Sequence, residues 1–224
     1  GSGTAKTVYI ASNDEIYANQ NASSLFRYIA YSSICDETEV ITNLNYLNVN
    51  NVTNMSYMFF YCGRYGMTSL DLGDNFDTSN VTNMSSMFYY IGYYYMTDLD
   101  LGDNFDTSNV TNMSSMFYGS GRQVKDSLDL GDNFNTSNVT NMNYMFYYCG
   151  YTNMTELDLG PAFTNIASSR TSFVTSCGKS GAVIYAPESI YKSSTQFRPN
   201  PSSTSIISYT RGTINPKYKT EWTK

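Results

Sequence analysis

One stretch of this sequence occurs three times. LDLGDNFDTSNVTNMSSMF occupies residues 70–88, returns unchanged at residues 99–117, and returns with three changes at residues 128–146. The same spacing of 29 residues extends one copy earlier, to Val52, Met55 and Phe59. A unit this short cannot bury its apolar side chains alone, so each copy has to stack on its neighbours. The repeat therefore predicts a solenoid of 29-residue coils.

The first part of each copy alternates apolar and polar residues. Met67-x-x-Leu70-x-Leu72-x-x-Asn75 fits the strand-and-turn pattern of leucine-rich repeats. Side chains alternate between the two faces of a strand, so Leu70 and Leu72 are expected to point inward and Asp71 outward. Strands of adjacent coils are then expected to pair in parallel.

The second part of each copy changes its period. Asn-Val-Thr-Asn around Val81 indicates a second short extended piece. Met84, Met87 and Phe88 follow at i, i+3 and i+4, which is the spacing of one helical face. We therefore predict an α/β repeat, a leucine-rich-repeat-like right-handed solenoid in which each coil contains a strand, a short strand and a short helix.

Weaker copies flank the array. Residues 157–163 and 170–178 form a fifth copy that is one residue short, and SSLF at residues 23–26 resembles the helical part. Strands are also expected at residues 7–10, 16–18, 182–186 and 206–209. The predicted organisation is a cloning remnant at residues 1–3, an N-terminal cap at 4–40, a solenoid of about five coils at 41–181, and a C-terminal cap or the start of a linker at 182–224.

Charge is distributed unevenly along the chain. The net charge is −6, with 6 Lys+Arg against 17 Asp+Glu in residues 1–178 and 7 against 2 in residues 179–224. An acidic body argues against nucleic acid, which requires clustered Lys and Arg. No stretch approaches the roughly 18 apolar residues that a membrane-spanning helix needs. We therefore expect neither a nucleic-acid partner nor a membrane span.

The chain contains no histidine, which limits the enzyme classes open to it. Without imidazole there is no Ser-His-Asp or Cys-His arrangement and no histidine metal ligand. Pairs of carboxylates remain, but nearly all of them occupy repeated columns, whereas a catalytic pair needs two different environments. We predict that the protein is not an enzyme and binds no cofactor.

The repeat also carries a family resemblance. The run L-D-L-x-x-x-F-D-T-S-N-V-T-N-M-S-x-M-F, within about residues 41–178, resembles the BspA-like leucine-rich-repeat surface proteins of bacteria. The resemblance implies an extracellular, cell-wall-associated or secreted protein that binds host or matrix components, without catalytic residues. The Gly-Asp after LDL and the tyrosine-rich connectors depart from the commonest spacing of that family.

Two sets of acidic residues recur in columns. The first is predicted to line the outward strand face and to be either a solvated surface or a site for cations or basic partners: Asp71, Asp100, Asp129 and Asp158, beside Asp98 and Glu156. The second has the spacing D-x-x-D, which lacks the alternating ligands of an EF-hand: Asp74, Asp77, Asp103 and Asp106. Asx-turn chemistry explains this second set, with calcium as the weaker alternative.

The connectors between copies are where the repetition stops. They are rich in Tyr, Gly, Ser, Asn and Arg, the residue types of an antibody paratope. The alternative is that tyrosine rings cover the corner before each strand. The candidate ligand-binding tyrosines are Tyr65, Tyr93, Tyr94, Tyr95 and Tyr151.

The cysteines follow the repeat. Cys62, Cys149 and Cys177 share one column with Ile91, which indicates buried apolar positions. Cys62 and Cys149 are three coils apart, roughly 15 Å at strand spacing, and too far apart for a disulfide. We predict free thiols, with a bond between Cys149 and Cys177 left open.

Function is predicted at the level of class. The first hypothesis is a cell-surface binding or adhesion module for a host or matrix protein or glycan. The alternative is a structural spacer of a larger surface protein. A third idea, a flat array that binds a repeating lattice, is based on Thr82, Thr111 and Thr140. The sequence does not specify the ligand, the curvature, the oligomeric state or the anchor.

Overall fold

A computed structural model describes residues 16–31, 41, 44–124, 126–180 and 182–187. Within this part of the chain the regular elements are strands and one short 3-10 segment, without an α-helix. In chain order they are β1 (Ile16–Tyr17), η1 (Leu44–Tyr46), β2 (Leu47–Asn48), β3 (Ser69–Asp71), β4 (Asp98–Asp100), β5 (Asp126–Asp129), β6 (Met154–Asp158) and β7 (Val183–Tyr185). The predicted strands at residues 7–10 and 206–209 lie outside the described residues.

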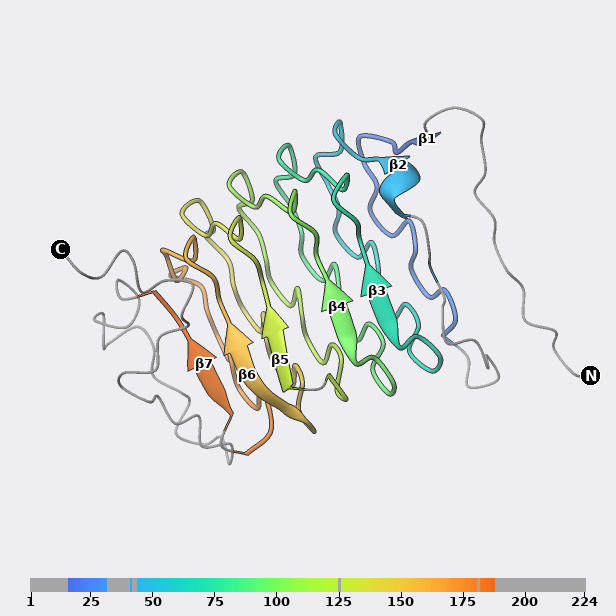
Figure 1. Cartoon of the computed structure of the whole chain (residues 1–224). Helices are drawn as coiled ribbons and strands as arrows, with labels where there is room; N and C mark the ends of the chain where they lie inside the picture. Colours follow the sequence, from blue (N-terminus) through green and yellow to red (C-terminus); the bar gives the residue numbers. More distant parts are fainter. Residues whose placement is uncertain (1–15, 32–40, 42–43, 125, 181, 188–224) are drawn as a thin grey trace, which may run out of the picture.

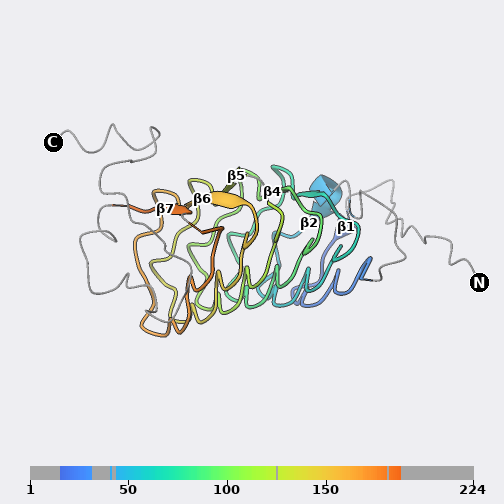
Figure 2. The same cartoon turned by 90° about the horizontal axis from the view of Figure 1, so that it is seen from below.

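The strands form small parallel sheets in chain order. The pairs are β1–β2, β3–β4 and β5–β6–β7, and every pair is parallel, as predicted. The register places Leu70 opposite Leu99 and Leu157 opposite Ile184, so equivalent positions of successive repeats are neighbours. Successive repeats lie side by side, with the strands along one side and turn segments along the other (Figures 1 and 2).

A second contact between repeats follows the strands. Single-residue parallel bridges connect Asn54 to Asn83, Asn83 to Asn112, and Asn112 to Asn141. These bridges fall at the end of the short extended piece predicted around Val81, but no strand forms there in the described residues. Repeats are therefore connected at this asparagine as well as through the strand pairs β1–β2, β3–β4 and β5–β6–β7.

The predicted helix at Met84, Met87 and Phe88 is wrong, although all three side chains are fully buried. The segment forms consecutive turns in which the backbone donors alternate between two kinds of acceptor. The N–H of Met87 donates to the carbonyl of Met84 at 3.2 Å, whereas the N–H of Phe88 donates to the carbonyl of Met116 in the next repeat at 2.9 Å. A helix would use both donors internally.

The spacing between repeats explains why no helix forms. The rings of Phe88 and Phe117 stack with centroids 5.3 Å apart, close to the separation of hydrogen-bonded strands. An α-helix with its side chains is about 10–12 Å wide, so adjacent helices cannot pack at this distance. The i, i+3, i+4 pattern therefore reports burial correctly but not the type of element.

Left-handed backbone positions recur in the turn segments. Ser86 and Ser115 have φ of 55°, and Tyr90 has φ of 52°. In an L-residue this conformation costs roughly 1–2 kcal/mol, which burial of the flanking Met and Phe side chains offsets. The repeated unit thus holds some local strain in return for close stacking.

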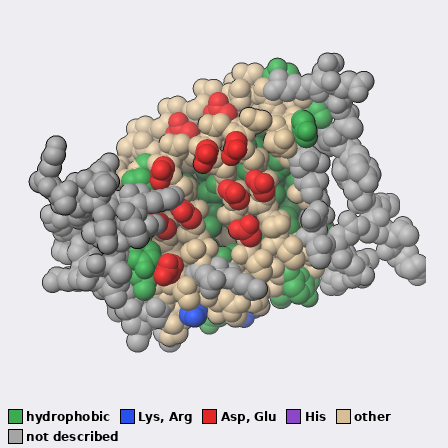
Figure 3. Space-filling view, in the orientation of Figure 1, with side chains coloured by type: hydrophobic (Ala, Val, Ile, Leu, Met, Phe, Trp, Pro, Cys, Tyr) green, Lys and Arg blue, Asp and Glu red, His purple; other side chains and the backbone are tan. Residues whose placement is uncertain are grey.

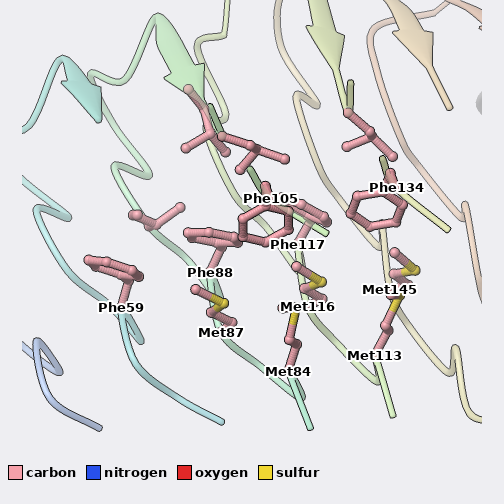
Figure 4. Packing of buried hydrophobic residues seen from close by; sticks show 14 of the residues in the cluster. Phe59, Met84, Met87, Phe88, Phe105, Met113, Met116, Phe117, Phe134 and Met145 are labelled. Carbon is pink, nitrogen blue, oxygen red and sulfur yellow. The ribbon is translucent and has the colours of Figure 1, made fainter. Parts of the chain in front are cut away.

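The core consists of ladders of identical side chains (Figure 4). One ladder of buried phenylalanines comes from the turn segments, and a second comes from the loops after the strands, with buried methionines beside the first (Figure 4). The first ladder contains Phe59, Phe88, Phe117 and Phe146, and the second contains Phe76, Phe105, Phe134 and Phe163. Stacked repeats therefore bury what a single repeat would expose.

The degenerate copies join the same stack. Phe26 of SSLF stacks on Phe59 at 5.2 Å with the rings 14° apart. At the other end Phe173 meets Phe146 at 5.6 Å, but edge-on, at 80°. The shorter fifth copy therefore keeps its place in the phenylalanine ladder with a different ring orientation.

Two serine substitutions distinguish consecutive turns from a helix. Ser115→Gly should raise the free energy of unfolding by up to about 1 kcal/mol, because glycine adopts the left-handed conformation without strain. Ser114→Gly, one residue earlier and outside the left-handed positions, should lower it by about 0.5–1 kcal/mol. Urea unfolding measures both, and a similar loss in the two variants would support a helix instead.

Candidate functional site

The predicted acidic column lies on the strands, and all of its members except the last are exposed. Asp71, Asp100 and Asp129 are exposed on β3, β4 and β5. Asp98 and Glu156, two positions before members of the column, are exposed as well. Carboxylates gather over the face that carries the strands (Figure 3).

Asp158, the last member of the column, is only 5% exposed. Strand β7 pairs with β6 and places Tyr185 opposite Asp158. The hydroxyl of Tyr185 donates to the Glu156 carboxylate at 3.4 Å. Burial first, and then the nearby charges of Glu156 and Asp158, raise the pKa of Tyr185. The acidic face is therefore partly covered where the last strand is added.

Each aspartate of this column also has a local structural role. The carboxylate of Asp71 accepts a hydrogen bond from the N–H of Gly73 at 2.7 Å, and that of Asp100 accepts one from Gly102 at 2.9 Å. The glycines have φ of 76° and 75°, a conformation that an L-residue rarely adopts. Asp129 and Asp158 make the same contact. The column thus fixes the turn after each strand.

The D-x-x-D set is built from similar turns. Asp77 accepts from the N–H of Ser79 at 2.9 Å, and Asp106 accepts from Ser108 at 2.7 Å. Asp74 and Asp103 are exposed. In the described residues no three His, Cys, Asp or Glu side chains come together as a metal site would require. The hydrogen bonds therefore account for Asp77 and Asp106 by Asx-turn chemistry.

Two threonine columns hold repeats together. A buried one, which the sequence analysis missed, donates from the hydroxyl to a carbonyl of the next repeat at 2.7–2.8 Å: Thr78, Thr107 and Thr136. The exposed column behaves alike, because the hydroxyl of Thr111 donates to the carbonyl of Thr82 at 3.2 Å. Thr140 donates in turn to Thr111 at 3.1 Å. These hydroxyls therefore serve stacking.

The connectors before the strands form an aromatic surface, here called the tyrosine–arginine edge: Arg64, Tyr65, Tyr93, Tyr94, Tyr95, Arg122 and Tyr151. Tyr65 stacks on Tyr94 with ring centroids 4.8 Å apart. Tyr93 is half-buried and meets Tyr94 edge-on at 4.8 Å. Tyr95 and Tyr151 are 56% and 40% exposed. The five predicted tyrosines thus include half-buried and exposed members.

Behind this edge, a further aromatic ladder runs along the turn segments. Phe60, Tyr89, Tyr118 and Tyr147 follow one another at 4.6–4.8 Å between ring centroids. Aromatic contacts of this kind add roughly 0.5–1.5 kcal/mol per pair beyond the area they bury. The rings nearest the core therefore have a clear packing role, as the corner-packing alternative expects.

One column of the edge alternates between arginine and tyrosine. The guanidinium carbons of Arg64 and Arg122 each lie 5.6 Å from the ring centre of Tyr93, and Arg122 lies 5.7 Å from that of Tyr151. These are cation–π distances. Arg122 also donates through Nε to the Thr152 hydroxyl at 3.0 Å. Aligning the connectors at 29-residue spacing would have revealed the alternation, but the arginines were not singled out.

In the part of the chain that the structure describes, the arginines near this edge have no acidic partner. Arg27, near the N-terminal end of the stack, lies 4.9 Å from the Phe60 ring centre. Among the described residues, no carboxylate forms an ion pair with Arg27, Arg64 or Arg122, because the carboxylates occupy the strand face and the loops after the strands. The Nε atom of Arg64 is buried without a hydrogen-bond partner. This region therefore combines uncompensated positive charge with aromatic rings.

The cysteine prediction is confirmed for the described thiols. Cys62, Cys149 and Cys177 are free and buried. Burial raises the pKa of the Cys62 thiol. A hydrogen bond to Cys149, followed by burial, raises the pKa of Cys177. These cysteines act as small core residues, and Cys35 lies outside the described residues.

Alkaline pH should weaken the fold through the aromatic ladder. Burial raises the pKa of Tyr89, Tyr90 and Tyr118 to about 12. Between pH 10 and about 12 the unfolded chain has lost these protons and the folded chain keeps them, so the free energy of unfolding should fall over this range. Tyr118→Phe should make the decline shallower. Urea unfolding at stepped pH checks this, and equal slopes in the two proteins would contradict it.

The described part of the chain has no helix with the length and apolar composition that a membrane crossing needs.

No curated protein and no solved structure matches the sequence. Residues 30–155 match a family described as "Mycoplasma protein of unknown function, DUF285". Because this match covers more than half of the 224 residues, the chain belongs to that family.

Proposed function

We propose that this protein is a non-enzymatic binding module of the BspA-like type, exposed on a bacterial cell surface or secreted. Its repeats form a leucine-rich-repeat-like right-handed solenoid whose coils are built from strands and turns. The module recognises a host or matrix protein or glycan on another surface. The tyrosine–arginine edge is the contact region.

The observation that carries this proposal is the exposure of aromatic rings beside arginines that form no ion pair with any described carboxylate. Tyr95 and Tyr151 are 56% and 40% exposed, and Arg122 has no carboxylate partner among the described residues. Tyrosine and arginine are enriched at interfaces and supply most hot spots, because they offer large contact area together with hydrogen bonding. This edge is also where the sequence stops repeating.

The acidic strand face is a secondary candidate. Asp71, Asp100 and Asp129 are exposed, so a basic partner could reach them. Their carboxylates already accept a hydrogen bond from the backbone two residues on, which gives the column a structural explanation. We therefore place the main contact on the tyrosine–arginine edge.

Catalysis has little support in this arrangement. The chain has no histidine, and Asp71, Asp100 and Asp129 repeat in near-identical exposed environments. A general acid and a general base need different pKa values, which identical environments do not produce. The proposal therefore includes no catalytic residue.

A structural spacer is the alternative, and one observation favours it. Many connector rings pack against neighbouring rings. Tyr65, for example, stacks on Tyr94 with ring centroids 4.8 Å apart. Rings engaged in this way stabilise the stack even when no ligand exists. Tyr93 and Tyr94 are therefore poor test positions, because their loss would alter packing and binding together.

Exposed tyrosines separate the two functions. The double variant Tyr95→Ala and Tyr151→Ala should lower affinity at least about tenfold, or about 1.4 kcal/mol, because the removed rings are contact area. Its melting temperature should stay within a few degrees of the parent. The matched control is Tyr46→Ala, because Tyr46 is 67% exposed in η1, at the opposite end of the strands (Figure 1).

Arrays of matrix proteins and glycans give the readout. A ligand bound by the parent and by Tyr46→Ala, but not by the double variant, would support the binding module. If no ligand binds, the spacer would be favoured. If the double variant binds as the parent does, the contact region does not lie on the tyrosine–arginine edge, and the acidic strand face becomes the candidate.

A further inference from the structure

The arginine–tyrosine column repeats with twice the period of the chain. Arg64, Tyr93, Arg122 and Tyr151 occupy equivalent positions in four successive repeats, so a cation recurs every second repeat and a ring stands between. With strands about 4.8 Å apart, the two guanidinium groups are separated by roughly 10 Å. This distance is comparable to the length of a disaccharide unit in an extended polysaccharide.

The column is partly accessible to solvent. Arg64, Tyr93 and Arg122 are half-buried and Tyr151 is exposed, so every residue of the column keeps some solvent-accessible surface. The rings hold the guanidinium groups in place, and Arg122 is fixed further by hydrogen bonds to Thr152 at 3.0 Å and to the Tyr93 hydroxyl at 3.3 Å. A positioned guanidinium has less freedom to lose when it binds an anion.

We infer that this column binds an acidic polysaccharide that carries one carboxylate on every second sugar. The carboxylate of each acidic sugar pairs with a guanidinium, the geometry that arginine forms best. The neutral sugar between them contacts the solvent-accessible part of the half-buried Tyr93 side chain, because both guanidinium groups already lie over its ring. The inference rests on the proposed function and specifies the ligand class of the same edge.

Charge density distinguishes this ligand from nucleic acid. Each strand of a DNA duplex carries a phosphate about every 3.4 Å, several for each arginine of the column. The rest of the body is acidic, with 17 Asp+Glu against 6 Lys+Arg in residues 1–178, and would repel the excess phosphates. A sparse anion with its charges two repeats apart avoids this repulsion.

Two oligosaccharides of equal length test the inference without any mutation. One alternates glucuronic acid with N-acetylglucosamine, and the other contains N-acetylglucosamine alone. In calorimetric titration the full chain should bind the oligosaccharide that contains glucuronic acid at least about tenfold more tightly than the neutral one. Only the acidic oligosaccharide supplies carboxylates for the arginines. Equal affinity for the two would overturn the inference.

Arginine variants locate the site. Arg122→Gln should lower affinity for the acidic oligosaccharide at least about tenfold, since it removes one of the two guanidinium groups. The matched control is Arg170→Gln, because Arg170 lies in the fifth repeat, outside the column, and donates to the Ala167 carbonyl. This control should bind as the parent does. Similar losses in both variants would contradict a site at the column.

A third ligand separates specific from general anion binding. An oligothymidylate of similar length should bind more weakly than the acidic oligosaccharide, and tighter binding would reassign the column to polyanions in general. If no acidic sugar binds but another array ligand is lost in the Tyr95 and Tyr151 double variant, the inference fails and the binding module stands. If nothing binds, both fail.

Discussion

The close stacking of identical side chains is the constraint on which this structure depends. Phenylalanine rings at 5.2–5.5 Å place the turn segments almost as close together as hydrogen-bonded strands. Helices do not fit at this spacing, so the backbone alternates its donors between its own turn and the next repeat. The recurring left-handed serines and tyrosines are a consequence of the same requirement.

The connectors escape this constraint and are free to vary. Core columns must match their neighbours, because a void or an overlap in one repeat is felt by the adjacent repeats. Where the turn segment meets the connector, packing between repeats still limits the choice of residue. A side chain at Gly119 would meet the ring of Tyr90 in the preceding repeat. Farther out, arginine and tyrosine alternate without disturbing the ladders. Specific recognition is therefore best sought in the column that breaks the 29-residue period.

Much of the fold could be predicted from spacing alone. The inward leucines, the parallel pairing and the asparagine bridge follow from the repeat, because equivalent residues must become neighbours when identical units stack. The helix could not be ruled out in the same way. Met84, Met87 and Phe88 lie on one face in a helix and are also all buried in consecutive turns, so their pattern does not distinguish the two.

The candidate site was predicted less completely than the fold. The tyrosine-rich connectors were identified from composition, but which rings are exposed depends on contacts between repeats, as the contrast between Tyr94 and Tyr95 shows. Asp158 is buried although the equivalent Asp129 is exposed, and the strand beside it, β7, carries no copy of the motif.

By itself the sequence determined that the chain stacks, with which period, and which residues form the core, because these follow from repetition and hydrophobic spacing. Only the tertiary structure decided how far apart the repeats lie. That distance excluded the helix and brought Arg64 and Arg122 to either side of Tyr93. Residues 29 positions apart become neighbours only when the backbone packs at strand spacing, and this depends on hydrogen bonds between repeats.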